Sequence, residues 1–216
     1  MKNPQYLPSY TIGEEIANSI THGIGSLLSI AGCVILIIFA AFTSNPYKIV
    51  SACVFGASLI ILFTMSTLYH SFTNQRVKFL FRIFDHSGIF LLIAGTYTPL
   101  TLVSLHGFLG WTLFGIVWLC AAFGIVLNAI GIERFKRICM ISYIGSGWCV
   151  IFAFIPLMKK ISLGGSLFLL AGGLFYTVGL LFYRKKDMQY MHSVWHVFVL
   201  FGAILHYLCI LFYVIH

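Results

Sequence analysis

Charged side chains are scarce in this sequence, and their scarcity excludes most classes of soluble protein. Only 8% of the 216 residues are charged, 60% are hydrophobic, and the mean hydropathy is +1.00. A soluble domain carries roughly 25% charged residues. The chain is therefore expected to be a multi-pass membrane protein. Its net charge of +8 is better explained by basic loops at a lipid surface than by nucleic-acid binding.

Paired cysteine motifs and a cleavable leader are also missing. None of the six cysteines forms a CxxC pair, and most lie in apolar runs, where cysteine behaves as a small hydrophobe. Neither a disulfide framework nor a thiolate zinc site is expected. The stretch up to Glu15 is polar, and the hydrophobic run after it is long enough to span a bilayer. The first helix is thus expected to be its own insertion signal.

Hydrophobic runs of the length that a membrane span needs, roughly twenty residues, occur seven times. They are Ser19–Phe42, Ile49–His70, Phe84–Leu105, Trp111–Ile132, Ile138–Leu157, Leu163–Tyr183 and His192–Ile215. The connections are short, which predicts one all-α domain over residues 19–216, a single seven-helix transmembrane bundle. Residues 1–18 are expected to form a cytoplasmic segment with a short interfacial helix, because Thr11 and Glu14 have the spacing of a capping box.

The basic residues indicate how this bundle is oriented. Three of them fall in the first, third and fifth connections, and the other ten lie before the first span or in the second, fourth and sixth connections. By the positive-inside rule the N-terminus is cytoplasmic and the C-terminus outside. The expected location is the bacterial plasma membrane.

The last span opens with two histidines, His192 and His196, four residues apart. This spacing stacks both imidazoles on one helix face. Ionisable groups in a membrane segment are costly and usually functional, and imidazole nitrogens suit zinc. A catalytic zinc needs a third protein ligand and an open coordination position.

Two further polar groups lie at the same cytoplasmic level, because the spans alternate in direction. His70 ends the second span, with Ser66 one helical turn deeper, and Asp85 begins the third. Three histidines would complete the zinc site, Asp85 could hold or deprotonate a water there, and Ser66 could orient either group. The alternatives are an interfacial or core histidine for His70 and a salt bridge from Asp85 to Arg82. His86 is rotated by about 100° from Asp85 and is expected to face elsewhere.

Alternatives remain for four more polar residues. Glu15, Asn18 and His22 share one helix face, which is interpreted first as a polar face bonded to loops and second as part of the chemistry. His22 is a further candidate ligand. His206 lies roughly 15 Å beyond His196 along the same helix, so it is expected to be a core or outer-half histidine outside the metal site.

Four groups of residues together resemble the hemolysin III family. They are Glu15-x2-Asn18-x3-His22, Ser66-x3-His70, the FDHSGIFLLIAGTYTP segment that contains Asp85, and His192-x3-His196. The family belongs with the progestin and adipoQ receptors, which include the adiponectin receptors, and the resemblance covers essentially the whole chain.

In adiponectin receptors the matching histidines bind zinc and the matching aspartate contacts it through water. The resemblance therefore implies His70, His192 and His196 as zinc ligands, Asp85 as the water holder, and Ser66 in support. The wider superfamily, which includes alkaline ceramidases, is regarded as metal-dependent hydrolases that often act on lipid amides.

The expected function is a zinc-dependent intramembrane hydrolase of a membrane lipid, at an amide bond, which affects membrane lipid composition. The expected partners are that lipid and the bilayer, with no nucleic acid or protein. One alternative is a cytolytic or pore-forming membrane protein, as the family name suggests, and another is a non-catalytic, zinc-stabilised membrane sensor. The short N-terminal segment lacks the long extension of the adiponectin receptors, which argues against a hormone-receptor role.

Overall fold

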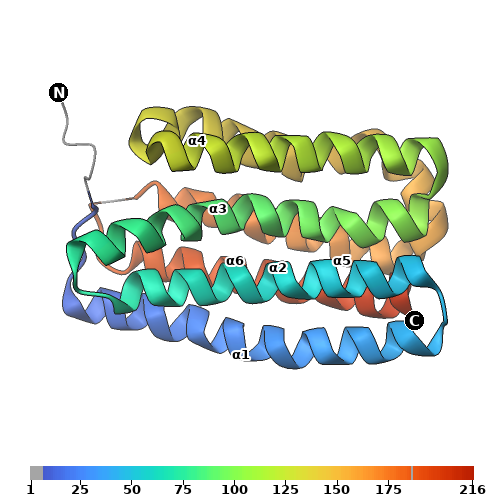
Figure 1. The fold of residues 1–216 in the computed structure, drawn as a ribbon, viewed down its shortest axis with the longest axis horizontal. Helices are drawn as coiled ribbons and strands as arrows, with labels where there is room; N and C mark the ends of the chain where they lie inside the picture. The colour runs from blue at the N-terminus through green and yellow to red at the C-terminus, as the bar shows by residue number, and fades with distance from the viewer. Residues whose placement is uncertain (1–6, 186) are drawn as a thin grey trace.

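Helices make up nearly all of the chain that the computed structural model describes, residues 7–185 and 187–216. They run alongside one another as a bundle (Figure 1). In chain order the elements are α1 Ile12–Phe42, α2 Pro46–Ser71, α3 Gln75–Pro99, the π-helical η1 Leu100–Leu105, α4 Gly107–Gly147, the 3₁₀ turn η2 Cys149–Ala153, α5 Phe154–Tyr183, α6 Met191–Ile210 and the π-helical η3 Leu211–Ile215. The prediction of an all-α protein is confirmed.

Within these described residues, five helical segments are long and apolar enough to cross a membrane. One of them, Gly107–Tyr183, is 77 residues long and combines α4, η2 and α5. Its backbone leaves helical geometry at Gly131 (φ 171°, ψ 98°) and at Ser162 (φ 62°, ψ 175°). Figure 1 shows the chain folding back on itself within α4. The count of seven crossings stays a prediction.

Side-chain caps fix where the first helices begin. The Thr11 hydroxyl accepts a hydrogen bond from the Glu14 backbone N–H, and the Glu14 carboxylate accepts one from the Thr11 N–H at 2.8 Å. This is the capping box that the sequence predicts. Asn45 and Asn74 cap α2 and α3 in the same manner, each through its side-chain oxygen. Because α1 continues unbroken from Ile12 to Phe42, its polar first turns are rigidly joined to the apolar remainder.

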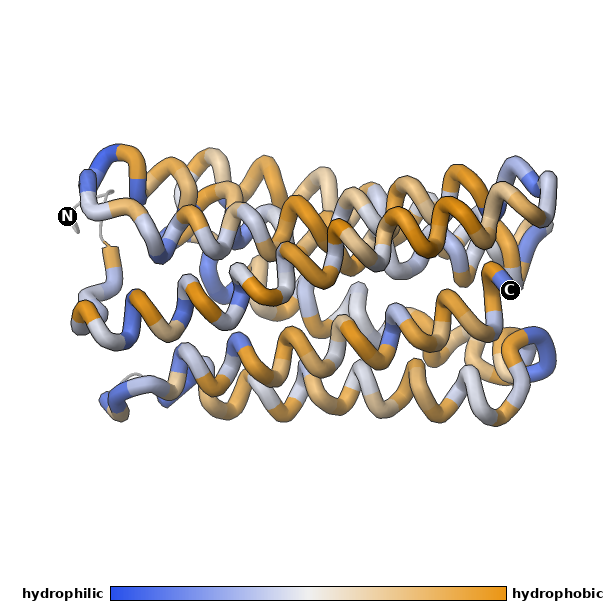
Figure 2. The backbone as a smooth tube through the Cα atoms, turned by 90° about the horizontal axis from the view of Figure 1, so that it is seen from below, coloured by the Kyte–Doolittle hydropathy of each residue, from blue (hydrophilic) through white to orange (hydrophobic). Residues whose placement is uncertain are grey.

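The outward faces of the helices are apolar. On α1, Ile16, Ile20 and Leu27 are 54%, 57% and 70% exposed. Figure 2 shows hydrophobic residues along the middle of the helices and hydrophilic ones mainly at their ends. Continuous exposed apolar surface of this kind is unfavourable in water but suits contact with lipid chains.

Packing between the helices places three polar helix ends around the start of α1. This helix contacts α2 on one side and α6 on another, and α2 packs in turn against α3. The turn between α2 and α3 and the start of α6 therefore lie at the same end of the bundle as the first turns of α1 (Figure 1).

Candidate metal centre

Three histidines from two helices meet at this end of the bundle. His70 comes from the last turn of α2, and His192 and His196 come from the first turns of α6. One ring nitrogen from each lies within 4.8 Å of the others, a group that could hold a metal ion. The Nε2 atoms of His192 and His196 are 3.1 Å apart. His70 and His196 are buried, and His192 is half-buried.

Two ring nitrogens of this cluster, one on His70 and one on His196, are held by α1. His70 Nδ1 lies 2.6 Å from Glu15 Oε2, and His196 Nδ1 lies 3.2 Å from the Asn18 backbone oxygen. His70 Nε2 is buried and makes no hydrogen bond. Histidines that bind zinc commonly donate their second N–H to a carboxylate or carbonyl in this way. A three-histidine donor set with two anchored rings and an unpaired buried nitrogen fits zinc.

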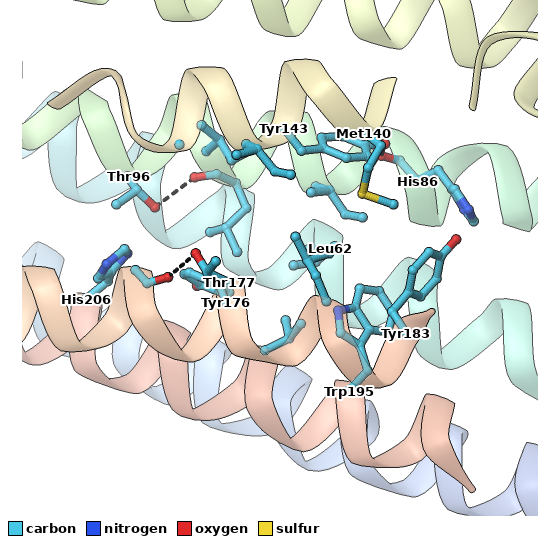
Figure 3. Close-up of a pocket in the computed structure, with 18 of the residues that line it drawn as sticks. Leu62, His86, Thr96, Met140, Tyr143, Tyr176, Thr177, Tyr183, Trp195 and His206 are labelled. Carbon is cyan, nitrogen blue, oxygen red and sulfur yellow. Dashed lines mark hydrogen bonds between the residues drawn. The ribbon is translucent and has the colours of Figure 1, made fainter. Parts of the chain in front are cut away.

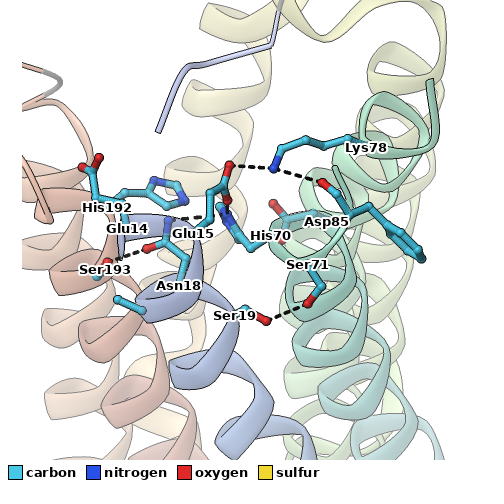
Figure 4. Close-up of polar contacts among 12 residues, drawn as sticks. Glu14, Glu15, Asn18, Ser19, His70, Ser71, Lys78, Asp85, His192 and Ser193 are labelled. Carbon is cyan, nitrogen blue, oxygen red and sulfur yellow. Dashed lines mark hydrogen bonds and ion pairs between the residues drawn. The ribbon is translucent and has the colours of Figure 1, made fainter. Parts of the chain in front are cut away.

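The polar face of α1 bonds to the histidines and to other residues of neighbouring helices. The interpretation that it bonds to loops is therefore wrong. Glu15 also forms an ion pair with Lys78 of α3, at 2.6 Å. The Asn18 side chain accepts a hydrogen bond from Ser193 Oγ at 2.6 Å, and its amide lies 3.4 Å from His70 Nδ1 (Figure 4). This single face thereby connects α2, α3 and α6 around the cluster.

His22, one turn deeper on α1, packs directly on the cluster. Its ring stacks on that of His196, with centroids 3.6 Å apart and an angle of 10° between the planes. Both of its ring nitrogens are buried without a hydrogen bond. The three-histidine group found in the described part of the chain does not include it. His22 therefore packs against His196 and lies outside the three-histidine group.

Asp85 is buried beside the histidines, 4% exposed. It is close enough to His70 and Ser66 to interact with both. Ser66 is itself fully buried and adjoins the Asp85 carboxylate. Arg82, the alternative partner for Asp85, forms an ion pair with Glu133 of α4.

His86 does not face away from Asp85, so that expectation is wrong. Its Nδ1 lies 3.0 Å from the Arg82 backbone oxygen and 3.6 Å from Asp85 Oδ2. The bond to the preceding turn brings the ring back toward the cavity that Asp85 also lines. Successive residues of a helix differ by about 100° in direction, but a wide cavity can still be lined by both of their side chains.

An apolar cavity of about 160 Å³ leads inward from this cluster. At its outer end it is lined by Asp85, His22 and His192, and it continues between α3, α4, α5 and α6. Aliphatic and aromatic side chains form most of its wall, with Leu62, Met140 and Trp195 among them (Figure 3).

A second opening, a cleft of about 680 Å³, is lined by His70. It lies between the residues before α1 and the turn from α2 to α3, and Glu15, Ser71 and Lys78 line it. Tyr10 also lines this cleft and packs against two rings of the cluster, with its ring centroid 5.0 Å from that of His192 and 5.7 Å from that of His70. Burial raises the pKa of Tyr10, so its phenol keeps its proton.

Sequence reasoning missed Tyr10, Lys78 and Ser193. Tyr10 precedes the first helix and belongs to no helical periodicity, so no pattern marks it. Lys78 looks like one more loop-side cation. Ser193 adjoins His192 and offers only its position next to a proposed ligand as a signal.

Comparison with known proteins shows similarity over nearly the full chain. Residues 10–207 match the family model described as "Haemolysin-III related". The chain is 45% identical to "Hemolysin-3" of Bacillus cereus over 94% of its own length and 93% of the relative's. It is 47% identical to "Hemolysin-3 homolog" of Bacillus subtilis (strain 168), over 94% and 96% of the two chains. The human "Monocyte to macrophage differentiation factor" is 27% identical, over 96% of this chain and 87% of its own.

Proposed function

Because this chain belongs to the haemolysin-III-related family of multi-pass membrane proteins, we propose that it is a zinc-dependent intramembrane hydrolase of a membrane lipid, cleaving an amide bond. One observation carries the proposal. Three histidine rings and a buried carboxylate, Asp85, meet where an apolar cavity ends.

His70, His192 and His196 would hold the metal through their converging ring nitrogens. A zinc ion held there would supply a Lewis acid for the substrate carbonyl and lower the pKa of water. Glu15 and the Asn18 carbonyl fix the orientation of two of the rings through Nδ1. These two rings are thereby held in position before a metal binds, so metal binding has to order fewer side chains.

Asp85 would move the proton in amide hydrolysis. Its carboxylate accepts a proton from the water that attacks the amide carbonyl carbon, and then returns this proton to the leaving nitrogen as the carbon–nitrogen bond breaks. The products are a carboxylic acid and an amine. The Ser66 hydroxyl, buried next to Asp85, would orient the carboxylate toward that water.

The two openings would admit different molecules during hydrolysis. The apolar cavity suits an acyl chain, because its wall consists mostly of aliphatic and aromatic side chains. The cleft, where the charged side chains of Glu15 and Lys78 lie, suits water and a water-soluble product. Turnover by this enzyme would change the composition of the surrounding lipid.

The proposal includes the topology of seven crossings with a cytoplasmic N-terminus. The breaks at Gly131 and Ser162 support two additional crossings within the segment 107–183. The basic residues support the orientation, ten against three. The histidine cluster would then lie at the cytoplasmic headgroup level.

A hydrolysis assay tests the reaction directly. Detergent-purified protein is incubated with a panel of N-acyl lipid amides, and released fatty acid is quantified by mass spectrometry. We expect wild type to cleave at least one amide and Asp85→Asn to lose at least about 10²-fold in rate, the usual contribution of a general base. We also expect Asp85→Asn to retain most of its zinc. Undiminished hydrolysis by Asp85→Asn would exclude the proposed role of this carboxylate.

The name of the relative "Hemolysin-3" favours a second candidate, a cytolytic or pore-forming activity. An aqueous pore needs a polar lining, and the wall of the cavity is mostly apolar. Dye release from liposomes discriminates between the two functions. A pore would leak without zinc and without lipid turnover, whereas leakage that follows hydrolysis would require both. A zinc-stabilised sensor, the third candidate, would bind metal, form no product and release no dye.

A further inference from the structure

Two polar rings face each other at the inner end of the cavity, far from the histidine cluster. His206 of α6 and Tyr176 of α5 both line it, with ring centroids 5.3 Å apart (Figure 3). His206 lies ten residues beyond His196 on a continuous helix, roughly 15 Å along its axis. Ionisable groups at such depth in a membrane protein commonly mark a functional site.

Each of these rings has one polar atom to which none of the described residues forms a hydrogen bond. His206 Nε2 lies 3.0 Å from the Leu169 backbone oxygen, so this nitrogen carries the proton and donates. Nδ1 is then the acceptor of the neutral ring, and it is buried and unpaired. The Tyr176 hydroxyl, which can donate and accept, is also buried and unpaired. Because both rings line the cavity, the pair offers one acceptor and one hydroxyl to a ligand that occupies it.

The backbone of the opposite helix makes room for both rings. A Cβ at Gly172 of α5 would come within 2.2 Å of the His206 ring, and a Cβ at Gly202 of α6 would come within 2.9 Å of the Tyr176 ring. Each ring thus sits over a glycine of the partner helix, four residues from the other ring's own position. Such reciprocal packing fixes both rings in place.

Neighbouring polar side chains have partners already. Thr96 donates to the Leu92 backbone oxygen at 2.8 Å, and Thr177 accepts from the Trp148 indole N–H at 3.0 Å. The unmet hydrogen-bonding capacity at this end of the cavity is therefore concentrated on His206 and Tyr176. Leaving both unmet is unfavourable in a low-dielectric interior.

We propose that His206 and Tyr176 form a second ligand subsite, which binds a hydroxyl group on the chain of the lipid ligand. A hydroxyl satisfies both rings at once, because it donates to His206 Nδ1 and accepts from the Tyr176 O–H. An oxo group accepts only, so it leaves Nδ1 unmet. An unsubstituted chain leaves both atoms unmet. This inference rests on the proposed function only in placing the ligand's head group at the histidine cluster.

The depth of the subsite sets where the hydroxyl lies on the ligand. The axial separation from His196, roughly 15 Å, is about half the hydrocarbon thickness of a bilayer. A chain that starts at the histidine cluster would therefore reach His206 and Tyr176 in its distal half. The substrate class is a lipid whose acyl chain is hydroxylated there.

Binding measurements on stearate, 12-hydroxystearate and 12-ketostearate test the subsite without requiring turnover. Each probe is titrated into purified protein, and complexes are quantified by native mass spectrometry. We expect wild type to bind the hydroxylated probe about tenfold more tightly than stearate, the effect expected when a ligand hydroxyl satisfies two buried groups. The affinity for 12-ketostearate should lie between the affinities for stearate and 12-hydroxystearate. Tyr176→Phe removes one oxygen and should reduce the preference to about threefold or less.

Tyr143→Phe is the matched control, because Tyr143 lines the same cavity but its hydroxyl already donates to the His86 backbone oxygen at 2.9 Å. This variant should keep the full preference, and His206→Phe should lose it. Equal binding of stearate and 12-hydroxystearate to wild type, or the same preference in Tyr176→Phe, would overturn the proposal and assign the space to a water molecule. If wild type prefers 12-hydroxystearate to stearate but hydrolyses no lipid, only the proposed hydrolase is refuted. If it hydrolyses a lipid amide but shows no such preference, only the subsite is refuted.

Discussion

At the scale of single residues, the candidate centre depends on how α1 orients the histidines. Glu15 and Asn18 contact the Nδ1 atoms of His70 and His196, and one ring nitrogen of each of the three histidines lies within 4.8 Å of the others. The positions of the three histidines follow from the sequence, because alternating spans bring their ends to one level. The roles of Glu15 and Asn18 do not, since a polar helix face reveals its partners only once α1 is packed between α2 and α6.

Glu15→Gln is expected to weaken zinc binding about 10- to 100-fold, the usual effect of losing a group that orients a metal ligand. The amide cannot match the carboxylate's bond to His70 Nδ1 or its ion pair with Lys78. Competition with a fluorescent zinc chelator measures the affinity.

Ser19→Ala provides the control for Glu15→Gln. Ser19 lies one turn along the same helix and bonds to Ser71 at 2.7 Å, so its loss removes a contact between the same two helices without touching a histidine. Its zinc affinity should equal that of wild type. If Glu15→Gln also binds zinc as wild type does, the orienting role assigned to Glu15 is wrong.

At the scale of the helices, close approach depends on small residues at particular contacts. A Cβ at Gly56 of α2 would lie 2.3 Å from Cys33 Sγ of α1, whereas a Cβ at Gly115 of α4 would meet nothing within 4 Å. The sequence predicts small residues in helix contacts in general. It does not separate glycines that touch a neighbour from glycines that face lipid, because that depends on how each helix is rotated.

Gly56→Ala is expected to lower the free energy of unfolding by about 1–3 kcal/mol, since the added methyl group overpacks the contact between α1 and α2. Gly115→Ala should be neutral or slightly stabilising, because alanine favours helix by about 1 kcal/mol over glycine. Thermal unfolding in detergent, followed by tryptophan fluorescence, compares the two variants. Equal stability of both would show that the α1–α2 contact tolerates a side chain at Gly56.

Helix boundaries show what the sequence can and cannot predict at this scale. The Thr11–Glu14 capping box is predicted and confirmed. Its helix, however, continues unbroken into the apolar run, because nothing between Ile12 and Ser19 interrupts helical geometry. The breaks at Gly131 and Ser162 fall near expected connections, but neither conformation can be read from composition.

At the scale of the whole molecule, two openings adjoin the cluster, an apolar cavity lined by His192 and a cleft lined by His70. Hydropathy and charge predict a membrane bundle with its histidines at one end. They cannot predict either opening, because a cavity arises from how side chains of several helices fail to fill the space between them.

Cysteine labelling tests the topology of seven crossings. In a background without native cysteines, Arg134→Cys should react only with a membrane-permeant maleimide, and Lys159→Cys should react with an impermeant one added to intact cells. These positions lie on either side of the fifth expected span, so the positive-inside rule assigns them to opposite faces. Labelling of both residues from the same side would contradict the proposed orientation of this segment.

Metal content is the most direct test of the central claim, that His70, His192 and His196 form a zinc site. Wild-type protein and a triple variant, His70→Ala, His192→Ala and His196→Ala, are purified without chelators, checked for folding by circular dichroism, and analysed by elemental mass spectrometry. We expect about one zinc per chain in wild type and none in the folded triple variant, because three histidine ligands and one open coordination position make a single zinc site. Folded wild-type protein without metal, or zinc retained in the triple variant, would contradict it.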